Sequence, residues 1–200
     1  AFWVQLDGTI SNYFSLTPYI VGTDIHSEFT TVSAAVAQAI ADGASLANPK
    51  NIHIKPKLNG YVENVVVVDG INLVGQGDQT VIHGKVSMST AGEASINNLT
   101  LRTNGDYCLE ITGAAATDLT VFNCNIYATD HTAINQASTS PGSIMPINNS
   151  FYFIEAPGIT VWDMTSAGFI SQVDCSSGNI GASTMPSNNS AGVMQIFNCL

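Results

Sequence analysis

The chain has 200 residues, a length that suits one domain and allows a sizeable apolar core. Charged residues make up 10% of it, and 5 Lys and Arg against 15 Asp and Glu give a formal net charge of −10. This charge argues against a nucleic-acid or anionic-membrane binder, because both need a cationic surface. No apolar run reaches the roughly 18 residues that would span a bilayer, so no membrane insertion is predicted. The remaining polarity, carried by Asn, Ser, Thr and Gly, favours β-structure with many turns.

Residues 1–28 hold several aromatic side chains without a core pattern of their own. These are Phe2, Trp3, Tyr13, Phe14 and Tyr19. Exposed apolar groups in that number usually mark a contact, so we predict an N-terminal arm or a connection to something upstream. No basic segment followed by an apolar one is visible as a signal peptide, and we expect a processed chain or a piece of a longer one.

A helix is predicted next, over about residues 30–42. Phe29, Val32, Val36 and Ile40 fall at helical spacing, and Gly43 follows as the expected C-cap. The domain spans residues 29–200, and the part that follows this helix is predicted to consist of strands. An open end of a strand stack needs covering, so we predict that this helix is a cap.

Short β-branched runs separated by Gly, Asp and Asn fill residues 59–84, with no helix between them. A repeat of similar segments continues this pattern: they begin at Thr80, Thr100, Thr120 and Thr160, at intervals of 20, 20 and 40. A period of this length without helices predicts one coil per period, each pairing in parallel with the next. The predicted fold class is therefore all-β, a parallel β-helix with those threonines at equivalent positions.

Two further segments share the 40-residue offset: SIMPINNS at 143–150 and STMPSNNS at 183–190. We predict that both are loops, which would present a repeated surface on one side of the solenoid. Asn123, Asp163 and Asn198 lie in matching contexts and are predicted turn or ladder residues. A turn is favoured for Asp163, since short polar side chains tolerate turn conformations.

The four cysteines have neither CxxC spacing nor a nearby His at metal-ligand spacing, which argues against a zinc site. Each lies beside apolar residues: Cys108, Cys124, Cys175 and Cys199. Buried free thiols are the favoured interpretation. Disulfide pairing stays open from the sequence alone.

One part of the chain resembles a known family. Within residues 29–84, the segments FTTVSAAVAQAI, IHIKP, GYVENV and GINLVGQGDQTVIHG resemble the opening of pectin methylesterases and related pectate-lyase-like right-handed β-helices. The resemblance implies a right-handed winding. The same fold is similar to modules in bacteriophage tailspikes and tail fibres, which share this low charge and this richness in Asn, Ser, Thr and Gly.

The catalytic motifs of the esterases are not matched. They comprise a Gln-Asp-Thr segment with the acid/base Asp, an Asp-Phe-Ile-Phe-Gly segment with the nucleophile, and a later Arg. Here Thr129 replaces the Gln before Asp130, Asp163 lacks the Phe-Ile-Phe-Gly, and no Arg follows Arg102. The resemblance therefore implies the scaffold and not the catalytic set.

Other polar residues also have a structural interpretation that we favour. Asp130 and His131 suit an acid–base pair, but also a polar turn. Glu63 and Asp78 are candidate Ca²⁺ ligands. A Ca²⁺ site needs several carboxylates that converge on the ion, so we favour a structural role for both residues.

His53 and His83 flank predicted strands and are expected at the surface or the edge of the core. The GQG at 75–77 is a lone GxG without a following helix, so a phosphate loop is not predicted. Aromatic residues suit either a sugar-stacking platform or, as we favour, core or subunit contacts: Trp3, Trp162, Tyr107, Tyr127, Tyr152 and Phe153. We assign no catalytic, cofactor-binding or metal-binding residue.

Three classes of function fit these patterns. We favour a structural module of a virion appendage, a phage tail fibre or tailspike-like protein used for host-surface attachment. The alternatives are a carbohydrate-active enzyme (a pectin esterase or lyase, or a polysaccharide depolymerase) and a secreted β-helix adhesin. With 5 cationic residues and one Arg, the chain is poorly suited to a polyanionic substrate.

The expected partners follow from this choice. The final IFNCL resembles an open strand, and an exposed strand edge invites pairing with another chain. Together with the arm and the repeated loops, this open strand predicts a homo-oligomer, specifically a trimer. The expected partners are other virion proteins and a surface polysaccharide. The predicted location is the virion, with secretion as the alternative.

Overall fold

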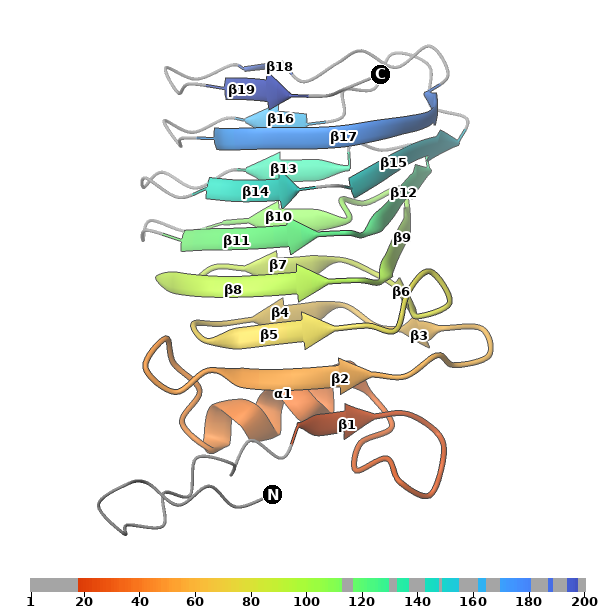
Figure 1. Cartoon of the computed structure of the whole chain (residues 1–200), viewed down its shortest axis with the longest axis vertical. Coiled ribbons are helices and arrows are strands. Elements are labelled where there is room, and N and C mark those ends of the chain that lie inside the picture. The colour runs from red at the N-terminus through yellow and green to blue at the C-terminus, as the bar shows by residue number, and fades with distance from the viewer. Residues whose placement is uncertain are drawn as a thin grey trace, which may run out of the picture.

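The structure is a computed structural model that describes residues 18–112, 117–129 and 133–136, and after them the strands within 143–154, 162–164, 170–180, 187–188 and 194–197. It is a parallel β-solenoid, since strands that are neighbours in a sheet belong to successive coils and pair in parallel (Figure 1). In Figure 1 the first sheet runs from left to right across the near face and the third sheet returns behind it, while the chain climbs from β1 to β19. This winding is right-handed. The predicted fold class is confirmed.

The chain passes through three sheets in turn from β2 to β16. In order of pairing, the first sheet contains β1 (Tyr19–Val21), β2 (Lys50–Ile54), β5 (Ile71–Val74), β8 (Gly92–Asn97), β11 (Thr117–Phe122) and β14 (Ser143–Ile147). The second contains β3 (Tyr61–Val62), β6 (Val81–His83), β9 (Thr100–Asn104), β12 (Asn125–Thr129), β15 (Asn149–Ile154), β17 (Ile170–Ile180) and β19 (Met194–Phe197). The third contains β4 (Val65–Val67), β7 (Val86–Met88), β10 (Leu109–Ile111), β13 (Ile134–Gln136), β16 (Trp162–Met164) and β18 (Ser187–Asn188).

Aliphatic side chains stack inside the solenoid from coil to coil. In the first sheet Ile52 pairs with Leu73, Leu73 with Ile96, and Ile96 with Val121, and all four are fully buried. Burying one such side chain is worth about 1.5–3 kcal/mol. Apolar residues at every second strand position therefore build the core and leave the alternate positions on the outer surface.

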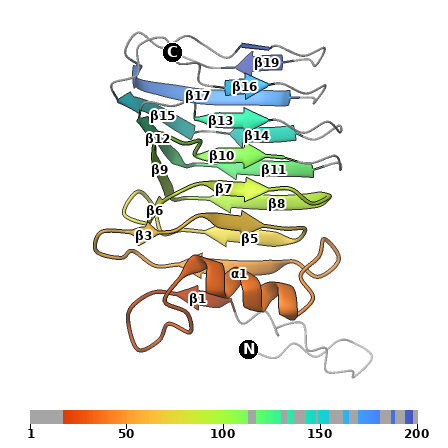
Figure 2. The same cartoon turned by 180° about the vertical axis from the view of Figure 1, so that it is seen from behind.

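The helix α1 (Val32–Ala41) lies at the N-terminal end of the stack (Figure 2). It begins at Thr31, whose side chain accepts a hydrogen bond from the Ala34 N–H at 3.3 Å. It ends before Gly43, whose φ of 77° is the left-handed conformation that glycine tolerates, as predicted for a helix end. The helix packs against β1, β2 and β4. Its role as a cap stays a prediction.

Part of the predicted arm belongs to the solenoid. β1 lies within residues 1–28 and pairs in parallel with β2. The Tyr19 ring lies 6.1 Å from the Phe29 ring between centroids, and its hydroxyl donates to Asp42 at 2.7 Å. Residues 1–17 lie outside the described part of the chain.

The predicted 20-residue register is wrong. Thr100 and Thr80 lie in adjacent coils, where the Thr100 N–H donates to the Thr80 carbonyl at 2.8 Å. Thr120, however, lies in β11 of the first sheet, where it pairs with Ser95. Thr160 lies outside the described residues.

Coil length varies because the corners between strands vary. Lys50 pairs with Ile71, 21 residues later, whereas Ser95 pairs with Thr120, 25 residues later. Between β6 and β9 the offset falls to 19, from Val81 to Thr100. There the six-residue corner at 75–80 is replaced by the two-residue corner at 98–99.

The predicted loop at 143–150 is also wrong, because it contains β14 and the start of β15. Of the similar segment at 183–190, the structure describes β18, which belongs to the third sheet, whereas β14 belongs to the first. The two segments therefore do not form the repeated surface that we predicted.

Candidate functional site

A polar notch opens on the outer surface where the second sheet turns into the third. The corner between β6 and β7 consists of Gly84 and Lys85, whereas the corner between β9 and β10 has four residues, 105–108. The longer corner leaves a cavity of about 570 Å³ beside the shorter one. We call this cavity the corner notch. Its lining includes Asn64, His83, Arg102, Asn104, Asp106 and Thr129.

The tight corner below the notch depends on a glycine and an asparagine. A Cβ on Gly84 would lie 2.0 Å from the Glu63 carbonyl oxygen, so no larger residue fits without a shift of the backbone. The Gly84 N–H donates to the Arg102 carbonyl at 3.0 Å, and the Lys85 N–H donates to Asn64 Oδ1 at 2.9 Å. These contacts fix the floor of the notch.

The longer corner is held by its own hydrogen bonds. Thr103 Oγ1 donates to the Asp106 carbonyl at 2.7 Å, and the Tyr107 N–H donates to Asp106 Oδ1 at 2.8 Å. The Gly105 N–H donates to the Thr129 carbonyl in the next coil at 2.8 Å, with Gly105 at a φ of 69°. The wall of the notch is thus ordered by hydrogen bonds within the corner and to the next coil.

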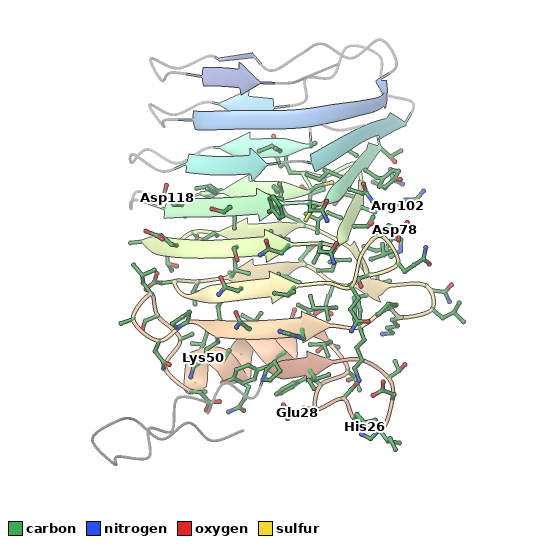
Figure 3. The ribbon with its side chains drawn as sticks, viewed as in Figure 1. His26, Glu28, Lys50, Asp78, Arg102 and Asp118 are labelled. Atoms are coloured by element: carbon green, nitrogen blue, oxygen red, sulfur yellow. The ribbon has the colours of Figure 1, made fainter. Side chains whose placement is uncertain are left out.

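A column of outward-facing side chains runs past the notch on the second sheet. His83 pairs in register with Arg102, and Arg102 with Tyr127. The neighbouring positions Ile82 and Leu101 are fully buried, so the column faces solvent. The Arg102 Cζ lies 5.9 Å from the centroid of the Tyr127 ring, a cation–π contact. Figure 3 shows Arg102 extending outward from the solenoid.

Lys85 forms ion pairs with two carboxylates beside the notch. Lys85 Nζ lies 2.9 Å from Glu110 and 3.5 Å from Asp106. The hydrogen bond with Glu110 is the main cause of a raised pKa at Lys85, so the ammonium is held in its charged form. Among the ion pairs of the described residues, none involves Arg102.

The residues considered for acid–base chemistry or for turns have different outcomes. Asp130 and His131 lie outside the described residues. Asp163 lies in β16, where it pairs with Asn135 and Ser187, so it takes the ladder position and the favoured turn is wrong; Asn198 lies outside the described residues. Asn123, with a φ of 52°, is a turn residue as predicted. The shared register of Asn123 and Asp163 is therefore wrong as well, because one lies in a corner and the other in a strand.

The carboxylates considered for Ca²⁺ have other contacts. Both Glu63 oxygens accept backbone N–H groups at the start of α1, at 2.8 and 2.9 Å. Asp78 lies in the corner at 75–80, where its carbonyl accepts a hydrogen bond from Thr100 Oγ1 at 2.9 Å. Across the part of the chain that the structure describes, no group of three or more His, Cys, Asp or Glu side chains is placed to hold a metal ion.

The remaining predicted residues take structural positions. His53 is exposed on β2 and His83 is half-buried on β6, which agrees with the expected surface positions. In the GQG segment, a Cβ on Gly75 would lie 2.4 Å from the Asn98 carbonyl oxygen, so this glycine permits close stacking of two coils. Tyr107 and Tyr127 are half-buried. The side chains of Trp162, Tyr152 and Phe153 are outside the described set.

Two of the cysteines are buried free thiols, as predicted. Burial raises the pKa of Cys108 to about 12 and that of Cys124 to about 11. Both therefore stay protonated at neutral pH and behave as core residues.

Sequence reasoning missed the column of His83, Arg102 and Tyr127. The available signal was a polar residue shortly before a glycine in VIHG and LRTNG, which marks two corners of unequal length. The register that unites these residues follows only from the coil lengths.

The chain matches no protein-family model, no curated protein and no solved structure. The likeness to pectin methylesterases rests on the sequence segments within 29–84, and the likeness to phage tailspikes rests on the fold and the composition. Among the described residues, no helix is long and apolar enough to cross a membrane.

Proposed function

We propose that the chain is a structural module of a virion appendage, of the tail-fibre or tailspike kind, that assembles as a homotrimer and serves attachment to a host surface. The observation that carries this proposal is that polar side chains of the described coils are used to join one coil to the next. On the first sheet Asn72 donates to Asn51 at 3.0 Å, and Ser95 donates to Asn72 at 2.7 Å. A stiff, laterally polar rod suits a mechanical role.

The same use of polar groups occurs at the corners. Asn123 Nδ2 donates to Asn98 Oδ1 at 3.0 Å, one coil away. Asp69 accepts the Leu46 N–H at 2.8 Å and the Glu93 N–H at 2.9 Å, so one carboxylate joins two coils. Carboxylates engaged in this way support the stack and favour a structural module over an enzyme.

Assembly is the first test. We expect sedimentation velocity of the purified full-length product to show a trimer at micromolar concentration, with elongated particles in electron micrographs. A compact monomer at that concentration would contradict the proposal.

The enzyme alternative has its own readout. Release of methanol from methylated pectin by the wild type, and its loss in Asp130→Asn, would favour an esterase instead. A secreted adhesin would differ in the flanking sequence of the full gene product, where a secretion signal or further long repeats would be found.

A further inference from the structure

We propose that the corner notch and the adjoining side chains of His83, Arg102 and Tyr127 form a binding site for a phosphorylated saccharide. The phosphate group lies against Arg102 and His83, and the sugar occupies the notch. This inference deepens the proposed function and rests on it, because it names the surface by which the module would attach to a host glycan.

Arg102 supplies the anion-binding group. Its guanidinium presents several N–H donors in a planar fork that matches phosphate oxygens. The side chain is exposed, and none of the ion pairs of the described residues engages it. The contact with the Tyr127 ring restricts the guanidinium, so less conformational entropy is lost when an anion binds.

His83 distinguishes a phosphate from a carboxylate. It lies on the strand next to Arg102, at the same register position, and neighbouring strands are about 4.8 Å apart. Both side chains line the notch, so a group bound there can meet both of them. A phosphate monoester has three terminal oxygens and can accept from both residues, whereas the two oxygens of a carboxylate can both be taken by the guanidinium fork.

The notch supplies partners for sugar hydroxyls. Asn104, Asp106 and Thr129 line it with amide, carboxylate and hydroxyl groups. Asp106 lies 3.5 Å from the Lys85 ammonium, which offsets the repulsion between this carboxylate and a bound anion. A cavity of about 570 Å³ lies within the range of small-ligand sites, about 300–1,000 Å³.

Because the chain is negatively charged overall, binding of an anion depends on the arrangement of donors at the site. With a formal net charge of −10, the chain as a whole repels anions. Binding of a phosphorylated ligand therefore has to come from the donors at the site and not from a cationic surface. This makes Arg102 testable against another cation of equal charge.

The test uses the full chain and four probes: glucose 1-phosphate, inorganic phosphate, glucose and glucuronic acid. Binding is measured by calorimetry and, for the two phosphates, by ³¹P line broadening. We expect glucose 1-phosphate to bind most tightly, inorganic phosphate more weakly, and glucose and glucuronic acid most weakly. Equal binding of glucuronic acid would overturn the assignment to phosphate, and no detectable binding of glucose 1-phosphate would overturn the site.

Variants locate the binding on the surface. Arg102→Gln is expected to weaken glucose 1-phosphate binding by about tenfold or more, the loss of one charge-assisted contact. Lys50→Gln removes the same charge at the start of β2 in the first sheet, outside the lining of the notch, and is expected to leave binding unchanged. Arg102→Lys keeps the charge without the fork and is expected to be intermediate. Unfolding curves confirm that each variant is folded, and equal affinity of Arg102→Gln and wild type would overturn the proposal.

The binding test and the assembly test can each give a negative result independently of the other. A monomer that binds glucose 1-phosphate through Arg102 would contradict the proposed appendage and keep the site. A trimer without such binding would keep the appendage and remove the site.

Discussion

Replacement of Glu63 by Ala tests how α1 is held on the end of the solenoid. Glu63 lies in the corner between β3 and β4, and its Oε1 accepts the Val32 N–H at 2.8 Å. Its Oε2 accepts the Ser33 N–H at 2.9 Å. These N–H groups belong to the first turn of the helix, where backbone N–H groups have no acceptor within the helix. The carboxylate also lies at the positive end of the helix dipole. One side chain thus joins the helix to the coil above it.

The expected loss in stability follows from these contacts. A carboxylate at a helix N-terminus contributes about 0.3–1 kcal/mol when exposed and up to about 2 kcal/mol when partly buried. The contact to Val32 is partly buried and that to Ser33 is exposed. We therefore expect Glu63→Ala to lower the free energy of unfolding by about 1–2 kcal/mol. Glu63→Gln keeps an acceptor oxygen but not the charge, and about half of that loss is expected.

Urea denaturation measures the free energy, and amide hydrogen exchange locates the change. We expect the exchange of α1 to accelerate in Glu63→Ala before that of the inner strands, as it would if the helix caps the stack. Glu93→Ala is the matched control, because it removes an equal charge from an exposed position on β8. If Glu63→Ala were no less stable than Glu93→Ala, the carboxylate would not hold the helix.

Four further outcomes are expected. Asn98→Ala should cost about 1–3 kcal/mol, because Asn98 has a φ of 55° and bonds to neighbouring coils, whereas Asn98→Gly should cost less in the same urea assay; equal losses would show that backbone strain is not the cause. The raised pKa values of Cys108 and Cys124, about 12 and 11, predict that stability is unaffected below about pH 9, the ordinary value of a thiol, and falls as the pH rises toward these values. Both thiols should also resist a thiol reagent at pH 8 until urea unfolds the chain, and rapid labelling of the folded chain at these two positions would be the contrary result. The hydrogen bond from Lys55 lowers the pKa of Asp24 to about 2, so the stability from this carboxylate is present above its ordinary value of 3.8 and is lost as the pH falls toward 2; an NMR titration of Asp24 with its midpoint near 3.8 would contradict this pairing.

The features that depend on local chemistry were predictable from the sequence. The apolar spacing from Phe29 to Ile40 and the glycine at position 43 predicted a helix over about 30–42, and α1 spans Val32–Ala41. The runs of valine and isoleucine predicted strands, and Val65 and Val67 lie in one of these strands and are both fully buried. Each of these predictions depends on neighbours in the sequence, so no long-range information was needed.

The register was not predictable, because it depends on the corners. The residues that follow Val74 and those that follow Asn97 both turn the chain from the first sheet to the second, but the former corner has six residues and the latter has two. The short corner is possible because Asn98 adopts the left-handed conformation. A search for one fixed period averages over such differences, and it aligned Thr100 with Thr120 although they lie in different sheets.

The candidate site was hidden for the same reason. His83, Arg102 and Tyr127 are separated by 19 and 25 residues, so no constant spacing unites them. Their proximity depends on the loss of residues in one corner and on the gain of residues in others. A single sequence offers no second example from which these lengths could be inferred.

Coil length also determines where a solenoid of this kind offers a pocket. Coils of equal length present an even outer surface, because each corner lies directly above the one before it. The corner from the second to the third sheet grows from the two residues 84–85 to the four residues 105–108. The step therefore lies between these two corners, where the corner notch is found. The inner ladder is continuous across it, since Val86 pairs with Leu109 and both are fully buried. A surface cavity is thus formed by two additional corner residues without a change in the core.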